Sequence, residues 1–241
     1  SRGGLGLNPD ENTVAELLKK QGYATMCIGK WHLGDQPEFL PTRQGFDHYF
    51  GLPYSNDMLK PAADGGKKVV PLMRDDKVLK LLADEDQDQL VRIYTEEAVK
   101  FIQDNKEKPF FLYLPHSMPH IPLFVPEDAY DPGPANAYQC VIEHIDAEVG
   151  RLVDKVRELG LADNTWIIFT SDNGPWIKFA NHGGNALPLR DGKSTTFEGG
   201  QRVPCIMWAP GRIPAGSSSN ALVSTIDLLP SLATLADSKL P

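Results

Sequence analysis

Short apolar runs alternate with amphipathic stretches of helical length, and this alternation constrains the fold more than any other feature of the sequence. Apolar runs of the kind that form buried strands occupy residues 23–28, 110–114, 165–170 and 203–208, with a shorter candidate at 221–224. Helical spacing predicts helices over residues 13–21, 87–103, 137–159 and 226–236. We therefore predict an α/β fold, a mostly parallel sheet sandwiched by helices.

Local signals refine the ends of these elements. Asn12 or Thr13 can cap the first helix, with Glu16 in the capping-box position. Thr225 or Asp227 can cap the last helix. Residues 34–71 are rich in Gly and Pro, and we predict a long irregular stretch there.

Charge and hydropathy exclude two classes of protein. The chain carries 24 basic and 32 acidic residues, a net charge of −8, and no basic stripe. Binding to nucleic acid needs clustered Lys and Arg, so we predict no nucleic-acid partner. No apolar run approaches the roughly 20 residues that cross a bilayer, so we predict no membrane span.

The three cysteines, Cys27, Cys140 and Cys205, lie far apart and form no C-x-x-C pair. A zinc ribbon or a thioredoxin-like redox motif is therefore excluded. Cys27 and Cys205 lie in apolar runs, which favours buried free thiols.

Four polar clusters occupy residues 29–34, 115–122, 170–175 and 189–200. The first three directly follow a predicted strand. Ligands in open α/β sheets bind beyond the carboxyl ends of the strands, so we expect these clusters to share a site.

Each cluster also has a structural interpretation when taken alone. Lys30 and His32 are compatible with a surface loop, and Asp172 with Asn173 is compatible with an Asx turn before Gly-Pro. Lys193 lies in a polar loop that does not fit a P-loop. Together, however, lysines, histidines and hard-cation ligands at strand ends describe a site for an oxyanion ester.

The four clusters, in this order, resemble the type I sulfatase family of the alkaline-phosphatase superfamily. The run Ile-Gly-Lys-Trp-His-Leu-Gly at residues 28–34 is the most specific match. The resemblance is greatest to arylsulfatase A and galactosamine-6-sulfatase members. Further agreement comes from residues 44–47, 50–55, 171–174, 192–200 and 225–230.

This resemblance implies catalytic roles for four residues. Lys30 would contact the sulfate and the aldehyde-derived nucleophile, and His32 would hold a hydroxyl of that nucleophile. His120 would face the sulfate and protonate the leaving oxygen. Lys193 would bind sulfate oxygens.

The resemblance also implies binding roles. Ser55 would make a polar contact with substrate. Asp172 and Asn173 would ligate a metal ion, normally Ca²⁺, with Mg²⁺ as the alternative. His116 matches no catalytic position of the family.

One departure from the family pattern is large. The family nucleophile is a formylglycine made within a Cys/Ser-x-Pro-x-Arg motif, and no such motif occurs here. The family's N-terminal strand with its Asp-Asp metal pair, and its C-terminal subdomain, are not matched either. We therefore expect residues 1–241 to be an incomplete part of a sulfatase catalytic domain, inactive by itself.

For the full-length parent, the resemblance implies hydrolysis of sulfate monoesters of a small molecule, glycan or lipid. The alternatives are a non-catalytic pseudoenzyme or truncated isoform, and a phosphoesterase of the same superfamily. A homo-oligomer is compatible with the resemblance. The expected location is lysosomal or secreted in an animal, and periplasmic or extracellular in a bacterium.

Overall fold

The computed structural model describes residues 4–63, 65–131 and 137–240. The chain forms two compact units, the first comprising residues 1–117 and 220–241 and the second comprising residues 118–219. No helix within the described ranges is long and apolar enough to cross a membrane.

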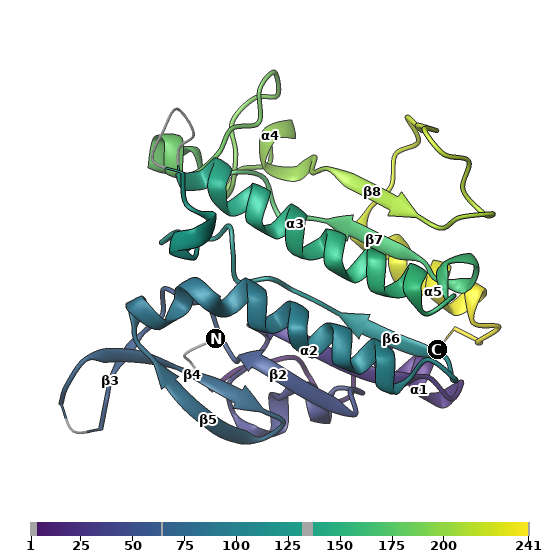
Figure 1. Cartoon of the computed structure of the whole chain (residues 1–241), viewed down its shortest axis with the longest axis horizontal. Helices are drawn as coiled ribbons and strands as arrows, with labels where there is room; N and C mark the ends of the chain where they lie inside the picture. The colour runs from purple at the N-terminus through teal and green to yellow at the C-terminus, as the bar shows by residue number, and fades with distance from the viewer. Residues whose placement is uncertain (1–3, 64, 132–136, 241) are drawn as a thin grey trace. The chain divides into compact units, whose positions relative to one another are not determined.

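The first unit is built on a sheet that has six strands among the described residues (Figure 1). Its main path runs β3–β4–β2–β1–β6, and β5 pairs with β4. The neighbouring strands β2, β1 and β6 are parallel, whereas β3, β4 and β5 are joined by antiparallel pairing. The parallel centre confirms the predicted fold class. The strands are β1 (Ala24–Lys30), β2 (His48–Leu52), β3 (Lys60–Pro61), β4 (Lys68–Arg74), β5 (Lys77–Leu82) and β6 (Phe110–Tyr113).

The helices of the first unit begin close to the predicted positions. Glu16 N donates to Thr13 Oγ1, and Thr13 N donates to Glu16 Oε2, so the predicted capping box is confirmed. Asp227 occupies the N-cap position of α5, but its carboxylate accepts from Ser224 N and not from the first turn of α5. The helices are α1 (Val14–Lys20), α2 (Leu90–Asp104) and α5 (Leu228–Leu235), with 3₁₀ helices at Pro37–Phe39, Pro41–Arg43, Asp84–Gln89 and Thr225–Asp227.

Helices cover both faces of the parallel strands. The register partners Cys27 and Tyr49 belong to a buried cluster that also contains Ala15 of α1. On the opposite face, the ring of Phe50 lies 6.2 Å from that of Tyr94 in α2. Figure 1 shows α2 in front of the sheet and α1 behind it. Because successive side chains of a strand point to opposite faces, both sides of β1 and β2 are buried.

The prediction of a long irregular stretch at residues 34–71 is wrong, because β2, β3 and the start of β4 lie there. Gly and Pro residues such as Gly51 and Pro71 favour an interruption of regular secondary structure when only the sequence is considered. Pro71 of β4 pairs with Leu81 of β5, whereas β2 and β3 pair with other residues of β4. The N–H that proline lacks is therefore not needed for pairing with β2 or β3.

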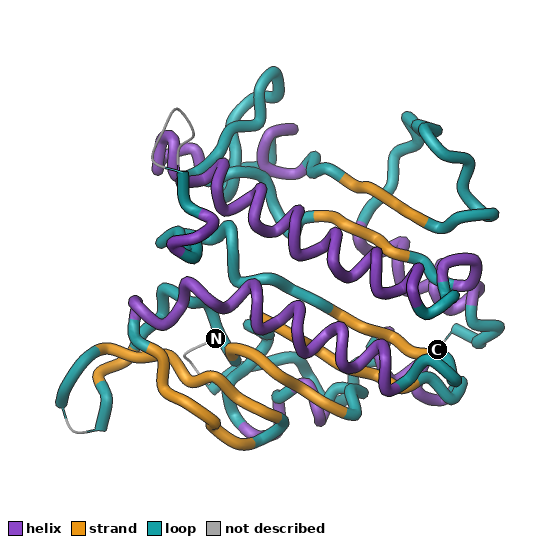
Figure 2. Tube along the Cα trace, in the orientation of Figure 1, coloured by secondary structure: helices purple, strands orange, loops and turns teal. Residues whose placement is uncertain are grey.

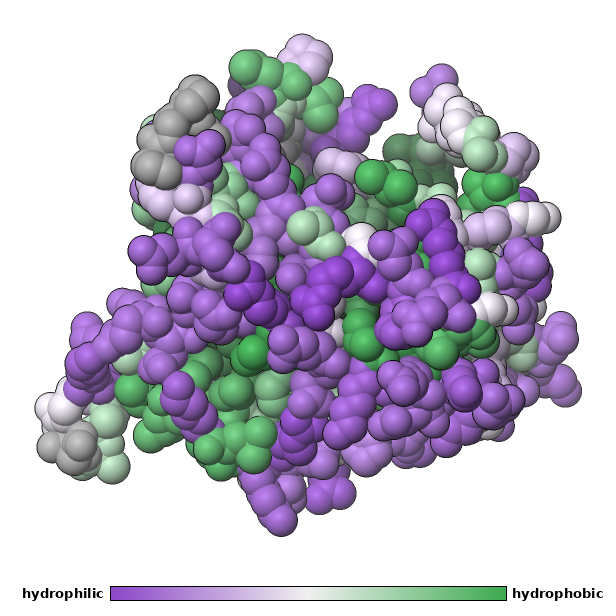
Figure 3. Space-filling view, in the orientation of Figure 1, coloured by the Kyte–Doolittle hydropathy of each residue, from purple (hydrophilic) through white to green (hydrophobic). Residues whose placement is uncertain are grey.

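The β4–β5 hairpin leaves an apolar edge exposed. Val78, Leu79 and Leu81 of β5 are each at least half exposed. Figure 3 shows a hydrophobic area in the lower left of the view, over β4 and β5. Lys77 and Lys80 lie in the same strand as these apolar residues. Lysines on an edge strand discourage pairing with other chains.

The second unit combines one long helix with a two-stranded antiparallel ribbon. In α3, the Arg157 guanidinium lies 5.5 Å from the ring centroid of Trp208 in β8, so the helix packs against the ribbon. Loops make up much of the rest (Figure 2). The elements are α3 (Ala137–Glu158), β7 (Ile167–Thr170), α4 (Glu198–Gln201) and β8 (Cys205–Trp208), with 3₁₀ helices at Glu127–Ala129, Ala162–Asn164 and Ile177–His182.

Several expectations of burial are wrong. Strands β7 and β8 form where predicted, but their residues are half-buried or exposed. Strand β6 is also only partly buried. Residues 221–224 form a loop. An apolar run favours a strand, but a strand is buried only when neighbouring layers cover it.

Two of the three thiols are buried. Cys27 and Cys140 are free and buried, while Cys205 is free and exposed, contrary to the expected burial of Cys205. Burial raises the pKa of the Cys27 thiol well above its ordinary value. This thiol therefore stays protonated at neutral pH and cannot act as a nucleophile.

Candidate functional site

The predicted site residues divide between the two units. Lys30, His32 and Ser55 belong to the first unit, whereas His120, Asp172, Asn173 and Lys193 belong to the second. The polar clusters at residues 29–34, 115–122 and 170–175 begin at or directly after the ends of β1, β6 and β7. Their predicted position at strand ends is confirmed within each unit.

In the first unit, backbone hydrogen bonds hold the loop that carries Lys30 and His32. Lys30 N donates to Pro115 O at 2.8 Å, and His32 N donates to Pro53 O at 3.1 Å. The loop is therefore tied to the segments that follow β6 and β2. Gly29 is required here, because a Cβ at this position would lie 2.0 Å from Pro115 O.

The side chain of Trp31 anchors the same loop in the core. Its indole Nε1 donates to Phe39 O at 2.8 Å, and its ring makes an edge contact with Phe46 at 6.1 Å. Trp31 is buried, whereas Lys30 is half-buried and His32 is exposed. His32 has φ 58°, a conformation that non-glycine residues adopt only at some cost. Lys30 and His32 thus lie on a loop that Trp31 anchors in the hydrophobic core.

Ser55 lies just beyond β2 and is 2% exposed. Its Oγ has no hydrogen-bond partner within the described part of the chain. Most buried hydroxyl groups in proteins are hydrogen-bonded, so an unsatisfied one calls for an explanation such as a ligand. This observation fits the predicted substrate contact. His116 packs instead near Tyr94, with ring centroids 6.4 Å apart.

In the second unit, His120 is half-buried and its Nδ1 lies 2.7 Å from Ile121 O. A carbonyl oxygen can only accept, so Nδ1 carries the proton of this hydrogen bond. Nε2 is then the nitrogen that can exchange a proton with a ligand. In this tautomer Nε2 can act as a general base, and it can act as a general acid when the ring carries a proton on both nitrogens.

Two loops of the second unit are tied to each other by their backbones. Gly174 N donates to Gly200 O at 3.0 Å, and Lys193 N donates to Pro175 O at 2.8 Å. A Cβ at Gly174 would lie 1.8 Å from Gly199 O, so only glycine allows this approach. The loop with Asp172 and Asn173 and the loop with Lys193, predicted as separate clusters, therefore form one substructure.

Trp176 brings His120 and Lys193 together. The Lys193 ammonium lies 4.8 Å from the centroid of the Trp176 ring, and the His120 ring lies 5.7 Å from it. A cation over an indole face is stabilised by the ring quadrupole. We did not predict a role for Trp176 from the sequence, although its position directly after Asp-Asn-Gly-Pro was a usable signal.

Asp172 and Asn173 fit part of a site for a hard cation. Asn173 Nδ2 donates to Gly174 O at 2.9 Å, which leaves the amide oxygen as the atom that can ligate a metal. Ca²⁺ takes about six to eight oxygen ligands, so these two residues would supply only a share of them. Across residues 4–63, 65–131 and 137–240, no group of three or more His, Cys, Asp and Glu side chains is placed to hold a metal.

Comparison with known proteins gives a consistent result. Residues 5–238 match the family model described as Sulfatase. N-acetylgalactosamine-6-sulfatase of Mus musculus is 37% identical over 246 residues, which cover 98% of this chain and 47% of the relative. Arylsulfatase G of Homo sapiens is 36% identical over 277 residues, which cover 100% of this chain and 52% of the relative. The chain thus spans about half the length of the curated relatives it matches.

Solved structures agree with the sequence comparison. The crystal structure of Ps i-CgsB in complex with k-i-k-neocarrahexaose is similar with a TM-score of 0.85 and 34% identity, covering 99% of this chain and 56% of that one. The PsFucS1 sulfatase from Pseudoalteromonas sp. is similar with a TM-score of 0.88 and 29% identity, covering 100% of this chain and 54% of that one.

Proposed function

Because this chain belongs to the sulfatase family, we propose that its full-length gene product is a sulfuric ester hydrolase that cleaves sulfate monoesters. Residues 1–241 would form part of one catalytic domain. The single observation that carries the proposal is the grouping of His120 and Lys193 around Trp176, on loops that are tied together by their backbones.

The residues of this chain suit binding of the sulfate and departure of the alcohol. Lys30 and Lys193 would each place an ammonium group against sulfate oxygens and neutralise the charge that develops there. His120, as an imidazolium protonated at both ring nitrogens, would donate its Nε2 proton to the leaving oxygen. His32 would hold the nucleophile in position, and Ser55 would contact the substrate through its buried hydroxyl.

Asp172 and Asn173 would contribute oxygen ligands to a divalent cation, which we propose to be Ca²⁺ with Mg²⁺ as the alternative. The bound cation would supply positive charge beside the ester oxygens. We propose that the remaining ligands belong to the Asp-Asp pair of the family's N-terminal strand, which residues 1–241 do not match.

The nucleophile is the part that this chain does not supply. The sequence has no Cys/Ser-x-Pro-x-Arg motif from which a formylglycine could be made, and the buried Cys27 thiol stays protonated. We therefore expect purified residues 1–241 to give no turnover. Detectable hydrolysis of p-nitrophenyl sulfate by this chain alone would contradict that expectation.

More specifically, we propose an arylsulfatase-type activity on a small-molecule, glycan or lipid sulfate ester. We propose a homo-oligomer as the assembly to test. The similarity to arylsulfatase G and to N-acetylgalactosamine-6-sulfatase supports sulfate esters of either an aryl group or a sugar. We propose a lysosomal or secreted location in an animal, or a periplasmic or extracellular one in a bacterium.

The test is a paired assay of the full-length gene product on p-nitrophenyl sulfate and p-nitrophenyl phosphate. We expect turnover of the sulfate to exceed that of the phosphate. A preference for the phosphate would identify a phosphoesterase. No turnover of either ester, with Ca²⁺ present and the protein folded, would identify a non-catalytic member of the family.

A further inference from the structure

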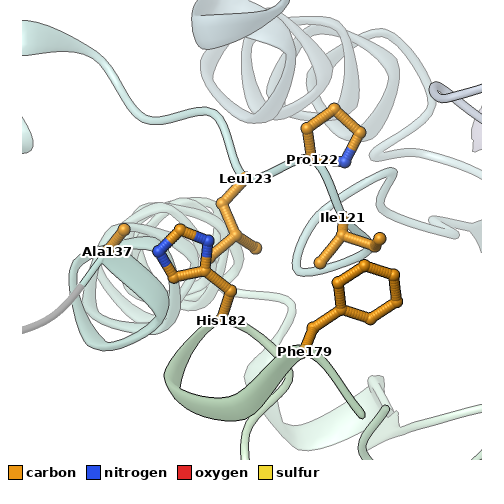
Figure 4. A pocket seen from close by; sticks show the side chains of 6 residues that line it. All are labelled: Ile121, Pro122, Leu123, Ala137, Phe179 and His182. Atoms are coloured by element: carbon orange, nitrogen blue, oxygen red, sulfur yellow. The ribbon is translucent and has the colours of Figure 1, made fainter. Parts of the chain in front are cut away.

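The second unit contains a hollow of about 310 Å³ (Figure 4). Figure 4 shows the ring of Phe179 and the imidazole of His182 beside Ile121 and Leu123. None of these side chains is a proposed sulfate contact, so the hollow does not mark the reaction site. Buried polar side chains of the first unit are better markers, because a polar group is costly to bury unless something requires it.

Gln87 is a polar residue in a fully buried position. It lies in the 3₁₀ helix Asp84–Gln89 and is 0% exposed. Gln87 Nε2 donates to Asn56 O at 3.2 Å and to Asp84 Oδ1 at 3.4 Å. A carbonyl oxygen and an ionised carboxylate only accept hydrogen bonds, so the amide presents its nitrogen to both. The side chain therefore ties the 3₁₀ helix to the segment that follows β2.

The amide oxygen of Gln87 makes this position unfavourable for stability. Within the described part of the chain, Oε1 has no hydrogen-bond partner. A buried acceptor without a partner carries a desolvation penalty that an apolar side chain of similar volume would avoid. Residues that break such a rule are often found where function requires them. We therefore looked for a functional group that the Gln87 amide holds in place.

The segment that Gln87 holds carries Ser55, the proposed substrate contact. Ser55 directly precedes Asn56, and its Oγ is also buried without a partner among the described residues. Ser55 O accepts a hydrogen bond from Met58 N at 3.0 Å. The bonds from Met58 and Gln87 thus fix the two peptide groups that follow the Cα atom of Ser55.

The 3₁₀ helix is a firm base for this contact. Ala83 N donates to Asp86 Oδ2 at 2.9 Å, and Lys80 Nζ lies 2.6 Å from Asp86 Oδ1. Helix α2 begins at Leu90, which is 0% exposed. Gln87 therefore lies between a capped turn and a packed helix, so the group that its amide holds is held firmly as well.

We propose that Gln87 is a positioning residue for Ser55. Its amide holds the carbonyl of Asn56, and the Ser55 hydroxyl thereby meets the sulfate ester in one orientation. The role rests on the proposed sulfatase function, in which Ser55 contacts the substrate. Because Ser55 contributes to binding and not to bond cleavage, loss of the Gln87 amide raises KM and leaves kcat nearly unchanged.

The kinetic test is Gln87→Met in the full-length gene product, assayed with p-nitrophenyl sulfate. Methionine fills a similar volume but cannot donate to Asn56 O. We expect KM to rise about tenfold and kcat to change less than about twofold. The matched control is Gln89→Met, because Gln89 lies half-buried in the same 3₁₀ helix and its amide bonds to Asp88 and Arg92. This control should change neither constant.

A double-mutant cycle with Ser55→Ala separates positioning from general structural damage. Once the Ser55 hydroxyl is absent, Gln87→Met should raise KM by less than about a further twofold. Effects of the two changes that multiply in full, or an unchanged KM in Gln87→Met alone, would overturn the positioning role. Gln87→Leu lacks the same donor and is the second variant, so a folding defect of one variant does not decide the test.

Hydrogen exchange tests the hold on this segment in the 241-residue protein, without any turnover. The amide of Met58 should exchange about tenfold faster in Gln87→Met, because the turn that protects it is no longer held. An unchanged exchange rate at Met58 would overturn the proposal even in an active enzyme. No turnover by the unchanged full-length protein would instead overturn the proposed function, and with it the role of Gln87 in substrate binding.

Discussion

Ile28 and Ile206 are the same residue type in strands of similar apolar character, yet Ile28 is 0% exposed and Ile206 is 62% exposed. Ile28 lies in β1, which has a parallel neighbour on each side and helices over both faces. Ile206 lies in β8, which pairs only with β7 among the described residues. The local sequence is alike, and the difference comes from the neighbours.

The two units also differ in how they hold the residues of the candidate site. The first unit presents Lys30 and His32 on a loop that a buried Trp31 anchors in a covered sheet. The second unit presents Lys193 on one of two loops that hold each other through their backbones, and its strands β7 and β8 are half-buried or exposed. Mutations should therefore cost stability in the first unit and local geometry in the second.

The largest expected difference is between Ile28→Ala and Ile206→Ala. Ile28→Ala leaves a cavity between packed layers and should lower the free energy of unfolding by about 2–5 kcal/mol. Ile206→Ala removes an exposed side chain and should change it by no more than about 0.5 kcal/mol. Urea unfolding of the 241-residue protein measures both, and equal losses would show that Ile206 is packed as tightly as Ile28.

Both lysines that we propose to contact the sulfate should be needed for activity. Lys30→Ala and Lys193→Ala should each lower kcat/KM for p-nitrophenyl sulfate by about 10²–10³, because each removes a cation that stabilises developing charge. Lys100→Ala in α2 and Lys155→Ala in α3 are the matched controls and should have little effect. Full activity of either site variant would show that its lysine does not contact the sulfate.

Gly174 and Gly150 of the second unit differ in their surroundings. Gly174 lies against the backbone of another loop, whereas a side chain at Gly150 in α3 would meet no other atom within 4 Å. Gly174→Ala places a methyl group against Gly199 O and should separate the loops that carry Asn173 and Lys193. We expect kcat/KM to fall tenfold or more, because a displacement of about 1 Å can lower the rate by roughly 10². Gly150→Ala in α3 meets nothing within 4 Å and should stabilise the helix by about 0.5–1 kcal/mol. Steady-state kinetics and thermal unfolding of both variants test this contrast, and an active Gly174→Ala enzyme would show that the loops need not touch.

The smallest expected effect concerns the acid stability of the first unit. Burial by itself would raise the pKa of Asp47, but hydrogen bonds from Lys19 and Thr25 outweigh it and hold the pKa below its ordinary value. The folded state therefore gains stability when Asp47 is charged, and this gain is lost as the pH falls below about 4. Asp47→Asn should cost at most about 1 kcal/mol at neutral pH, because the carboxylate is partly exposed.

The measurement for Asp47→Asn is urea unfolding at pH 7 and again near pH 3. The disadvantage of the variant should be smaller at the lower pH, because the stabilisation from the charged carboxylate declines as the pH falls below the ordinary pKa of an aspartate. An equal deficit at both pH values would mean that the side chain acts by shape and not by charge.

Much of the candidate site could be predicted because its signals are local. The motif at residues 28–34, the His-x-Pro at residues 120–122 and the Asp172-Asn173 pair each occupy a few consecutive positions at a strand end. Helical periodicity likewise placed α1, α2 and α3 to within a few residues. By contrast, β2 to β5 were missed, because Gly51 and Pro71 locally suggest loops and only pairing with distant strands makes these segments regular.

The sequence alone thus determined the family motifs, their order and their attachment to strand ends, because these depend on residues that are neighbours along the chain. Only the tertiary structure decided which strands are buried, that Trp176 lies between His120 and Lys193, and that a hollow opens beside Phe179. These features depend on contacts between residues far apart in sequence, such as Gly174 with Gly200, and no local pattern specifies such contacts.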